Sequence, residues 1–190
     1  MPLILAVLLA VFAIFSCQKT SLQTDAGSAT ELNGNGGGEV GRGGGASNDC
    51  FPTVVNLIAG QYMTAGTISV RNDSTNIYVT YHTGNGWSLT RCHLYVGDSA
   101  NIPVNNSGNA TPGRFPYKSG VISDTTYSFT VPISALGNAT CGYVAAHCGL
   151  IQRDEEGNTI STQSGWGFGT PVTSTQSNWA MKTSYCRCAL

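Results

Sequence analysis

Apolar and polar residues alternate along most of the chain after residue 50, which is the pattern of β-strands with one buried face. The predicted strands are residues 67–70, 76–83, 87–96, 127–133, 141–150 and 179–186. No segment of ten residues shows the helical period of 3.6, so the pattern predicts an all-β fold.

The alternation also assigns side chains to the two faces of each strand. Ile77, Val79 and Tyr81 should share one face of residues 76–83. In residues 87–96, strict alternation places Trp87, Leu89, Arg91, His93 and Tyr95 on one face and Cys92, Leu94 and Val96 on the other.

Turn-forming residues separate these strands. Gly84-Asn85-Gly86 favours a hairpin between residues 76–83 and 87–96. Residues 50–190 are long enough for one hydrophobic core and too short for two comfortable domains. Several short strands separated by turns predict a single disulfide-stapled antiparallel β-sandwich.

Residues 97–122 interrupt the pattern with a long segment rich in Pro and Gly. A loop of this length in a compact domain is uncommon and often functional. The alternative is a packed Ω-loop that Ile102, Phe115 and Tyr117 attach to the domain.

The N-terminal residues 2–15 carry no charge. They are shorter than the roughly 20 residues that span a bilayer, but they suit the apolar region of a secretory signal. Ile14-Phe15-Ser16-Cys17 follows and resembles the lipobox of bacterial lipoproteins. The resemblance implies a signal peptide at residues 1–16 and acyl chains such as palmitate on Cys17; the alternative is an ordinary signal peptide with an incidental cysteine.

Residues 17–49 are rich in Gly, Ser, Thr and Asn, and such a composition cannot bury a core. They are expected to form a flexible linker between Cys17 and the domain at residues 50–190. A short tether behind a lipid anchor resembles Bacteroidetes-type lipoproteins. That resemblance implies a cell-envelope protein held at the outer membrane by its lipid, exposed at the surface or in the periplasm.

Charged residues make up 10% of the chain, and the net charge is −1. The sequence contains no basic patch of the kind that binds nucleic acid. It also contains no acidic cluster of the kind that holds a hard metal ion. No serine lies in a G-x-S-x-G elbow, and Asp and Glu together number only 10. The sequence therefore predicts a protein that is not an enzyme and needs no cofactor or metal.

The chain contains seven cysteines. If Cys17 is lipidated, an even set remains for three disulfides: Cys50, Cys92, Cys141, Cys148, Cys186 and Cys188. Cys186 and Cys188 are two residues apart, so each is expected to bind a different partner. The alternative is a zinc site built from Cys141, Cys148, Cys186 and Cys188, with His147 as a further ligand.

Aromatic and histidine side chains are the remaining candidates for binding. Trp166, between two glycines, and also Trp87 and Trp179, could offer a ring face to a sugar. Flanking glycines equally allow a tryptophan to pack in a core. His93 and His147 are expected to be half-buried, hydrogen-bonded residues, with a metal-binding or catalytic arrangement as the alternative.

Most of residues 60–186 is similar to a recurring module of secreted and surface proteins in bacteria and archaea. The similar segments are Ala65-Gly66-Thr67, Tyr78-Val79-Thr80-Tyr81, Gly86-Trp87, His93-Leu94-Tyr95-Val96-Gly97, Ile102-Pro103, Pro112-Gly113, Phe115-Pro116, Ala145-Ala146-His147, Gly165-Trp166-Gly167 and Asn178-Trp179-Ala180. The module has no established activity, so the resemblance implies secretion and a β fold and transfers no catalytic residue.

Three Asp-Ser or Asp-Thr motifs resemble the O-glycosylation acceptors of exported Bacteroidetes proteins, with Ser74, Ser99 and Thr125 as the acceptors. The alternative is that each aspartate stabilises a turn. Together these observations favour a membrane-anchored β-sandwich with a structural or adhesive role and a glycan or protein as its surface partner. The second hypothesis is a module that binds carbohydrate or another polymer.

Overall fold

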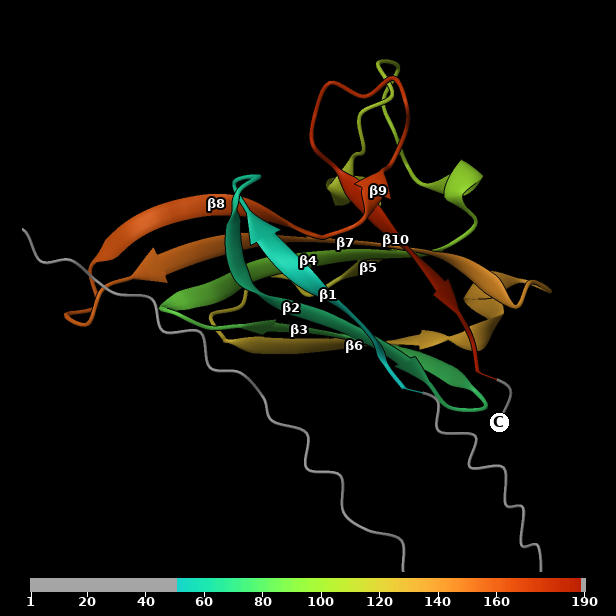
Figure 1. Ribbon diagram of the computed structural model, residues 1–190, viewed down its shortest axis with the longest axis horizontal. Helices are drawn as coiled ribbons and strands as arrows, with labels where there is room; N and C mark the ends of the chain where they lie inside the picture. The colour runs from blue at the N-terminus through green and yellow to red at the C-terminus, as the bar shows by residue number, and fades with distance from the viewer. Residues whose placement is uncertain (1–50, 189–190) are drawn as a thin grey trace, which may run out of the picture. The chain divides into compact units, whose positions relative to one another are not determined.

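The computed structural model describes residues 51–188, and the all-β prediction is confirmed (Figure 1). The predicted signal peptide, Cys17, the predicted linker and Cys50 lie outside the described residues. The strands are β1 (Thr53–Ala59), β2 (Met63–Asn72), β3 (Asn76–Thr83), β4 (Trp87–Gly97), β5 (Tyr117–Lys118), β6 (Thr126–Pro132), β7 (Cys141–Arg153), β8 (Thr159–Gly167), β9 (Thr170–Pro171) and β10 (Met181–Cys186). Three single 3-10 turns complete the elements: η1 (Ser99–Asn101), η2 (Pro112–Arg114) and η3 (Ile133–Leu136).

The strands form one antiparallel sheet in the order β5-β4-β7-β8-β1-β2-β3-β6, and β10 pairs with both β7 and β9. The amides of Ser119, Ile122 and Asp124 donate to carbonyls of β4, and the chain then enters β6 beside β3. The two ends of the sheet therefore approach each other. The arrangement is barrel-like, with one curled sheet, and differs in this respect from the two separate sheets of the predicted sandwich.

A β-bulge in β4 changes which side chains are buried. The register with β7 shifts between Leu89 and Arg91. The extra residue, Thr90, reverses the alternation. Trp87 and Leu89 therefore lie in the core together with Cys92, whereas strict alternation had placed them on the opposite face from that cysteine.

The predicted hairpin at Gly84-Asn85-Gly86 is a tight turn but not a hairpin. Asn85 and Gly86 have positive φ angles of 54° and 78°, and the Trp87 amide donates to the Gly84 carbonyl. However, β3 pairs with β2 and β6, while β4 pairs with β5 and β7. The turn passes the chain from one part of the curled sheet to the other.

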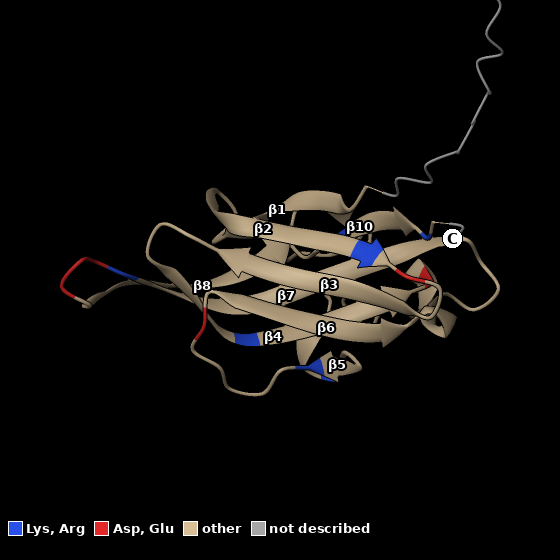
Figure 2. Cartoon of the chain, turned by 90° about the horizontal axis from the view of Figure 1, so that it is seen from below, with Lys and Arg blue, Asp and Glu red and all other residues tan. Residues whose placement is uncertain are grey.

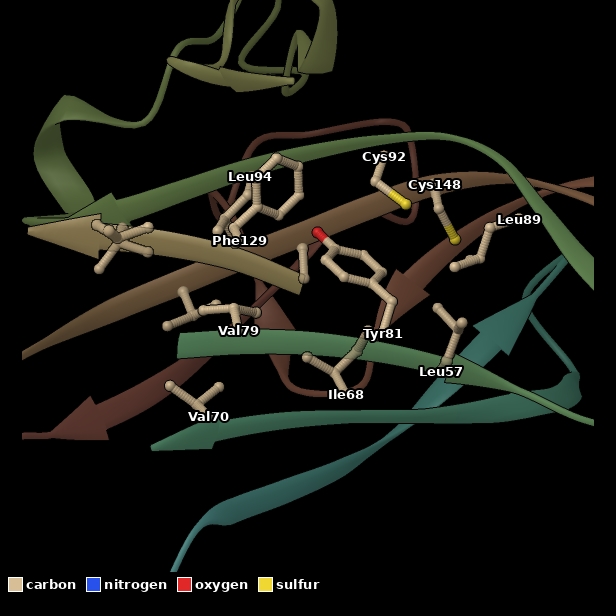
Figure 3. Close-up of a cluster of buried hydrophobic side chains, with 14 of the residues drawn as sticks. Leu57, Ile68, Val70, Val79, Tyr81, Leu89, Cys92, Leu94, Phe129 and Cys148 are labelled. Carbon is tan, nitrogen blue, oxygen red and sulfur yellow. The ribbon is translucent and has the colours of Figure 1, made fainter. Parts of the chain in front are cut away.

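The main hydrophobic core fills the inside of the curled sheet (Figure 3). Tyr81, Leu57, Ile68, Leu89 and Leu94 are among its fully buried side chains. The phenol of Tyr81 donates to the His93 carbonyl at 3.0 Å, so its polar atom is satisfied inside the core.

A second hydrophobic cluster lies on the outer face of β4, β7 and β8. Its buried members are Tyr95, Ile102, Ala110, Phe115, Ala145, Trp166, Val172 and Ala180. They come from the sheet and from two loops, residues 98–116 and 168–180. The cluster is what holds those loops on the sheet.

Charged side chains are few and scattered over the strands and turns (Figure 2). Within residues 51–188, no helix has the length and apolarity needed to cross a bilayer.

Candidate functional site

Two loops that are far apart in the sequence join above the outer face of the sheet (Figure 1). The Asn109 side chain connects them, because its Oδ1 accepts from the amides of Ser177 and Asn178 at 2.8 and 3.1 Å. Thr173 Oγ1 donates to the Gly108 carbonyl at 2.8 Å. We call residues 98–116 and 168–180 together the loop lobe. Hydrogen bonds inside the loop lobe therefore fix the positions of its two loops relative to each other.

For the Pro- and Gly-rich residues 97–122, the alternative of a loop packed against the domain is confirmed. Ile102 and Phe115 are 4% and 1% exposed and belong to the second cluster. Tyr117 lies in β5 and packs instead against the main core. The segment is therefore attached to the domain from both sides of the sheet.

One cavity of the loop lobe lies beside Trp179 and has a volume of about 310 Å³. It is lined by Pro171, Thr173, Ser174, Gln176, Asn178, Trp179, Ala180 and Met181. Gln176 fixes its wall, because Oε1 accepts from the Thr173 amide at 2.9 Å and Nε2 donates to the Ala180 carbonyl at 2.7 Å. None of the lining side chains is ionisable. An aromatic ring beside amide and hydroxyl groups suits an uncharged polar ligand.

The three predicted tryptophan positions differ in accessibility. Trp166 and Trp87 are 4% and 3% exposed, and the Trp166 ring packs edge-on against Phe115 and His147. Both are core residues, so neither offers a ring face to a ligand. Trp179 is half-buried and lines the cavity, so the structure leaves it as the platform candidate.

The cysteines follow the disulfide prediction in part. Cys141 and Cys186 face each other across β7 and β10 and form a disulfide. Cys188 is also disulfide-bonded, so Cys186 and Cys188 have different partners, as predicted. Cys92 and Cys148 lie directly opposite each other in β4 and β7 but are free thiols. The structure differs from the prediction of three disulfides at these two residues.

The two thiols act as core side chains. Cys92 and Cys148 point into the main core beside Leu89 (Figure 3). A buried thiol packs as a small apolar group. Burial raises the pKa of Cys92 to about 12 and raises the pKa of Cys148 as well, so both stay protonated at neutral pH.

The histidines His93 and His147 form a cross-strand pair on the outer face. Their Nδ1 atoms are 3.3 Å apart, and His147 Nε2 lies 2.8 Å from Ser164 Oγ. Burial, with a smaller contribution from His93, lowers the pKa of His147 to about 3. Burial also lowers the pKa of His93, helped by Arg91 and Lys118. The prediction of half-buried, hydrogen-bonded histidines is confirmed.

The residues predicted as ligands of the alternative zinc site do not support such a site. Cys141, Cys186 and Cys188 are in disulfides, which leaves Cys148 as the one free thiol of that set. Among residues 51–188, no three His, Cys, Asp or Glu side chains are grouped closely enough to hold a metal ion.

The proposed O-glycosylation acceptors are not equally accessible. Ser74 and Thr125 are exposed, whereas Ser99 is half-buried and its Oγ accepts from Lys182 Nζ at 2.5 Å. The aspartate of each motif accepts hydrogen bonds from backbone amides one to three residues further along the chain, at Asp73, Asp98 and Asp124. The turn-stabilising role is therefore present at all three motifs.

Comparison with protein-family models, curated proteins and solved structures finds no match to this chain.

Proposed function

We propose that the chain is an exported, lipid-anchored protein of the cell envelope whose β domain is a non-catalytic binding module, and that an uncharged glycan binds beside Trp179. The cavity at Trp179 carries the binding proposal. Its wall combines one half-buried aromatic ring with hydroxyl and amide side chains and contains no charge.

Sugars present apolar C–H faces and a rim of hydroxyl groups. An aromatic ring packs against the C–H faces, because the ring face is electron-rich, while Ser and Asn side chains hydrogen-bond to the hydroxyl groups. The volume of about 310 Å³ is at the lower end of small-molecule sites, so the cavity would take one or two sugar rings of a longer chain.

Two features support export and the absence of catalysis. Disulfides persist in oxidising compartments, and Cys141, Cys186 and Cys188 are all disulfide-bonded. Asp73 and Asp124 accept hydrogen bonds within their own turns, so these carboxylates have structural tasks. Cys17 supplies the anchor in this proposal; labelled palmitate should enter the full-length protein and should not enter Cys17→Ser.

The binding proposal is tested by screening the full-length protein against neutral oligosaccharides and measuring each positive by calorimetry. Trp179→Ala should weaken binding at least tenfold, and Asn178→Ala should weaken it less. Tyr62→Ala is the matched control, because that exposed aromatic ring does not line this cavity. Circular dichroism checks that each variant is folded. Binding that is unchanged in folded Trp179→Ala, or the absence of any neutral glycan ligand, would contradict the proposal.

An adhesive role is the second candidate. Phe51 and Tyr62 are 84% and 87% exposed, and exposed aromatic side chains are common contact residues in protein interfaces. If adhesion is the function, Tyr62→Ser should reduce binding of cells or of the purified protein to host matrix proteins, whereas Trp179→Ala should not.

A further inference from the structure

A second cavity lies against the β9–β10 pair and contains a positive charge. Its volume is about 350 Å³. It is lined by Val55, Tyr143, Phe168, Gly169, Thr170, Lys182, Thr183 and Ser184. Pro171 and Met181 are register partners that line the cavity beside Trp179, whereas their neighbours Thr170 and Lys182 line this one. Successive side chains of a strand point to opposite faces, so the two cavities are separate sites.

Lys182 brings a half-buried ammonium group that has no negative partner among residues 51–188. Its Nζ donates to Ser99 Oγ at 2.5 Å and to the Val172 carbonyl at 2.8 Å, and lies 5.1 Å from the centre of the Tyr143 ring. These partners are dipoles and a ring, not anions. Within residues 51–188, no acceptor takes the third N–H of the ammonium. A partly desolvated cation gains from an anionic partner that also accepts a hydrogen bond.

Phe168 brings an exposed ring on a backbone that is held in place. The side chain is 55% exposed. Its amide donates to the Asn56 carbonyl at 2.7 Å, and its carbonyl accepts from Thr183 Oγ1 at 2.8 Å. A Cβ added at Gly169 would lie 2.1 Å from the Lys182 carbonyl oxygen, so the chain after Phe168 runs tightly against β10. The ring is therefore presented from a fixed position.

The remaining lining is polar and uncharged. Thr170 Oγ1 donates to the Lys182 carbonyl, and Thr183 Oγ1 donates to the Phe168 carbonyl. Both hydroxyl oxygens keep lone pairs that can accept from a ligand, and Ser184 adds an exposed hydroxyl. The site thus combines one cation, one aromatic surface and several hydroxyl groups.

We propose that this cavity binds a carboxylated sugar, with the carboxylate on Lys182 Nζ and an apolar ring face on Phe168. Lys182 supplies the charge complementarity, and Phe168 with the hydroxyl groups suits the body of a sugar. The site is separate from the one beside Trp179, so either proposal can fail without the other.

The experiment measures trigalacturonate binding to the full-length protein by calorimetry, at low and at high salt. Wild type should bind at one site, and added salt should weaken binding because the contact is an ion pair. Lys182→Gln and Phe168→Ala should each weaken binding at least tenfold. Lys182→Arg, which keeps the charge, should retain most of the affinity. Lys118→Gln, a charge change at an exposed lysine of β5 that does not line the cavity, should have no effect.

Thermal unfolding verifies that the variants are folded before binding is compared. The proposal is overturned if trigalacturonate does not bind, or if folded Lys182→Gln or Phe168→Ala binds like wild type. It is also overturned if a neutral oligosaccharide of the same length binds this site equally well, because Lys182 would then contribute no recognition of the carboxylate.

Discussion

Lowering the pH from about 7.5 to about 5 should destabilise the domain through His147. Burial beside His93 lowers its pKa from 6.5 to about 3 in the folded state. Because the folded pKa is the lower one, the unfolded chain takes up the proton first as the pH falls. The stability contributed by neutral His147 is therefore complete above about pH 6.5 and is lost progressively between about pH 6.5 and 3.

The size of the loss follows from the two pKa values. Each pH unit between them changes the free energy of unfolding by about 1.4 kcal/mol, so a fall to about pH 5 would remove at most about 2 kcal/mol. The ring is partly exposed, and solvent screening reduces this to about 1 kcal/mol. Among residues 51–188, the charged groups that lower the pKa of His93 are Arg91 and Lys118, and both are cations that disfavour a further proton on the pair.

Urea unfolding followed by tryptophan fluorescence measures the effect, since Trp87 and Trp166 are buried. Wild type should lose about 1 kcal/mol between the two pH values. His147→Gln, which keeps a polar side chain but does not titrate, should lose clearly less. His82→Gln, at an exposed position of β3, should behave like wild type. Equal losses in wild type and folded His147→Gln would refute this account of the pair.

Three further predictions concern the covalent and steric features of the sheet. Cys141→Ser/Cys186→Ser opens a bridge with a sequence separation of 45 and should reduce the free energy of unfolding by about 2–4 kcal/mol in urea titrations; a loss below about 0.5 kcal/mol would contradict this. Gly66→Ala should lower the free energy of unfolding by about 2 kcal/mol or more in thermal unfolding, because the new Cβ would lie 1.9 Å from a backbone carbonyl oxygen of β3. Gly84→Ala is the control and should be nearly neutral, because a Cβ there would lie in open space. Cys92 should resist alkylation in the native protein at about pH 8 and react in urea, as mass spectrometry of its peptide would show, because burial raises its pKa to about 12.

The alternation of side chains predicted the fold class and many strands, because a strand with one buried face alternates apolar and polar residues along the sequence. Ile77, Val79 and Tyr81 share the buried face of β3, as expected. β1 and β8 were not predicted. β8 reads Thr-Ile-Ser-Thr-Gln-Ser before Gly165 and Trp166, with polar residues on both faces, so its alternation is weak.

Pairing partners were harder to predict than strands. The turn at Gly84–Gly86 has local hairpin chemistry, but the bulge at Thr90 and the long contact of β4 with β7 decide where the chain goes next. Such information lies in contacts between distant residues. The cavity beside Trp179 also depends on contacts between distant residues. Its wall depends on Gln176 and on Asn109 from the other loop, and no sequence pattern indicated this role for either residue.

The side chain of Asn109 has a practical consequence for producing the protein. Asn109-Ala110-Thr111 is a sequon for N-linked glycosylation, and so is Asn72-Asp73-Ser74. Both asparagine side chains have structural partners: Asn109 Oδ1 joins the two loops of the lobe, and Asn72 Oδ1 accepts from Tyr185 at 2.7 Å.

Secretion from yeast or mammalian cells exposes these sequons to an oligosaccharyltransferase before folding is complete. A glycan on Asn109 Nδ2 would take the place of its hydrogen bond to Ser177 Oγ and would sit between the two loops. In protein from such a host, the two loops of the loop lobe would be separated, while the sheet would still give a normal β-type circular dichroism spectrum. Ligand screens are therefore better made with protein from a bacterial periplasm, where disulfides form and this modification is generally missing.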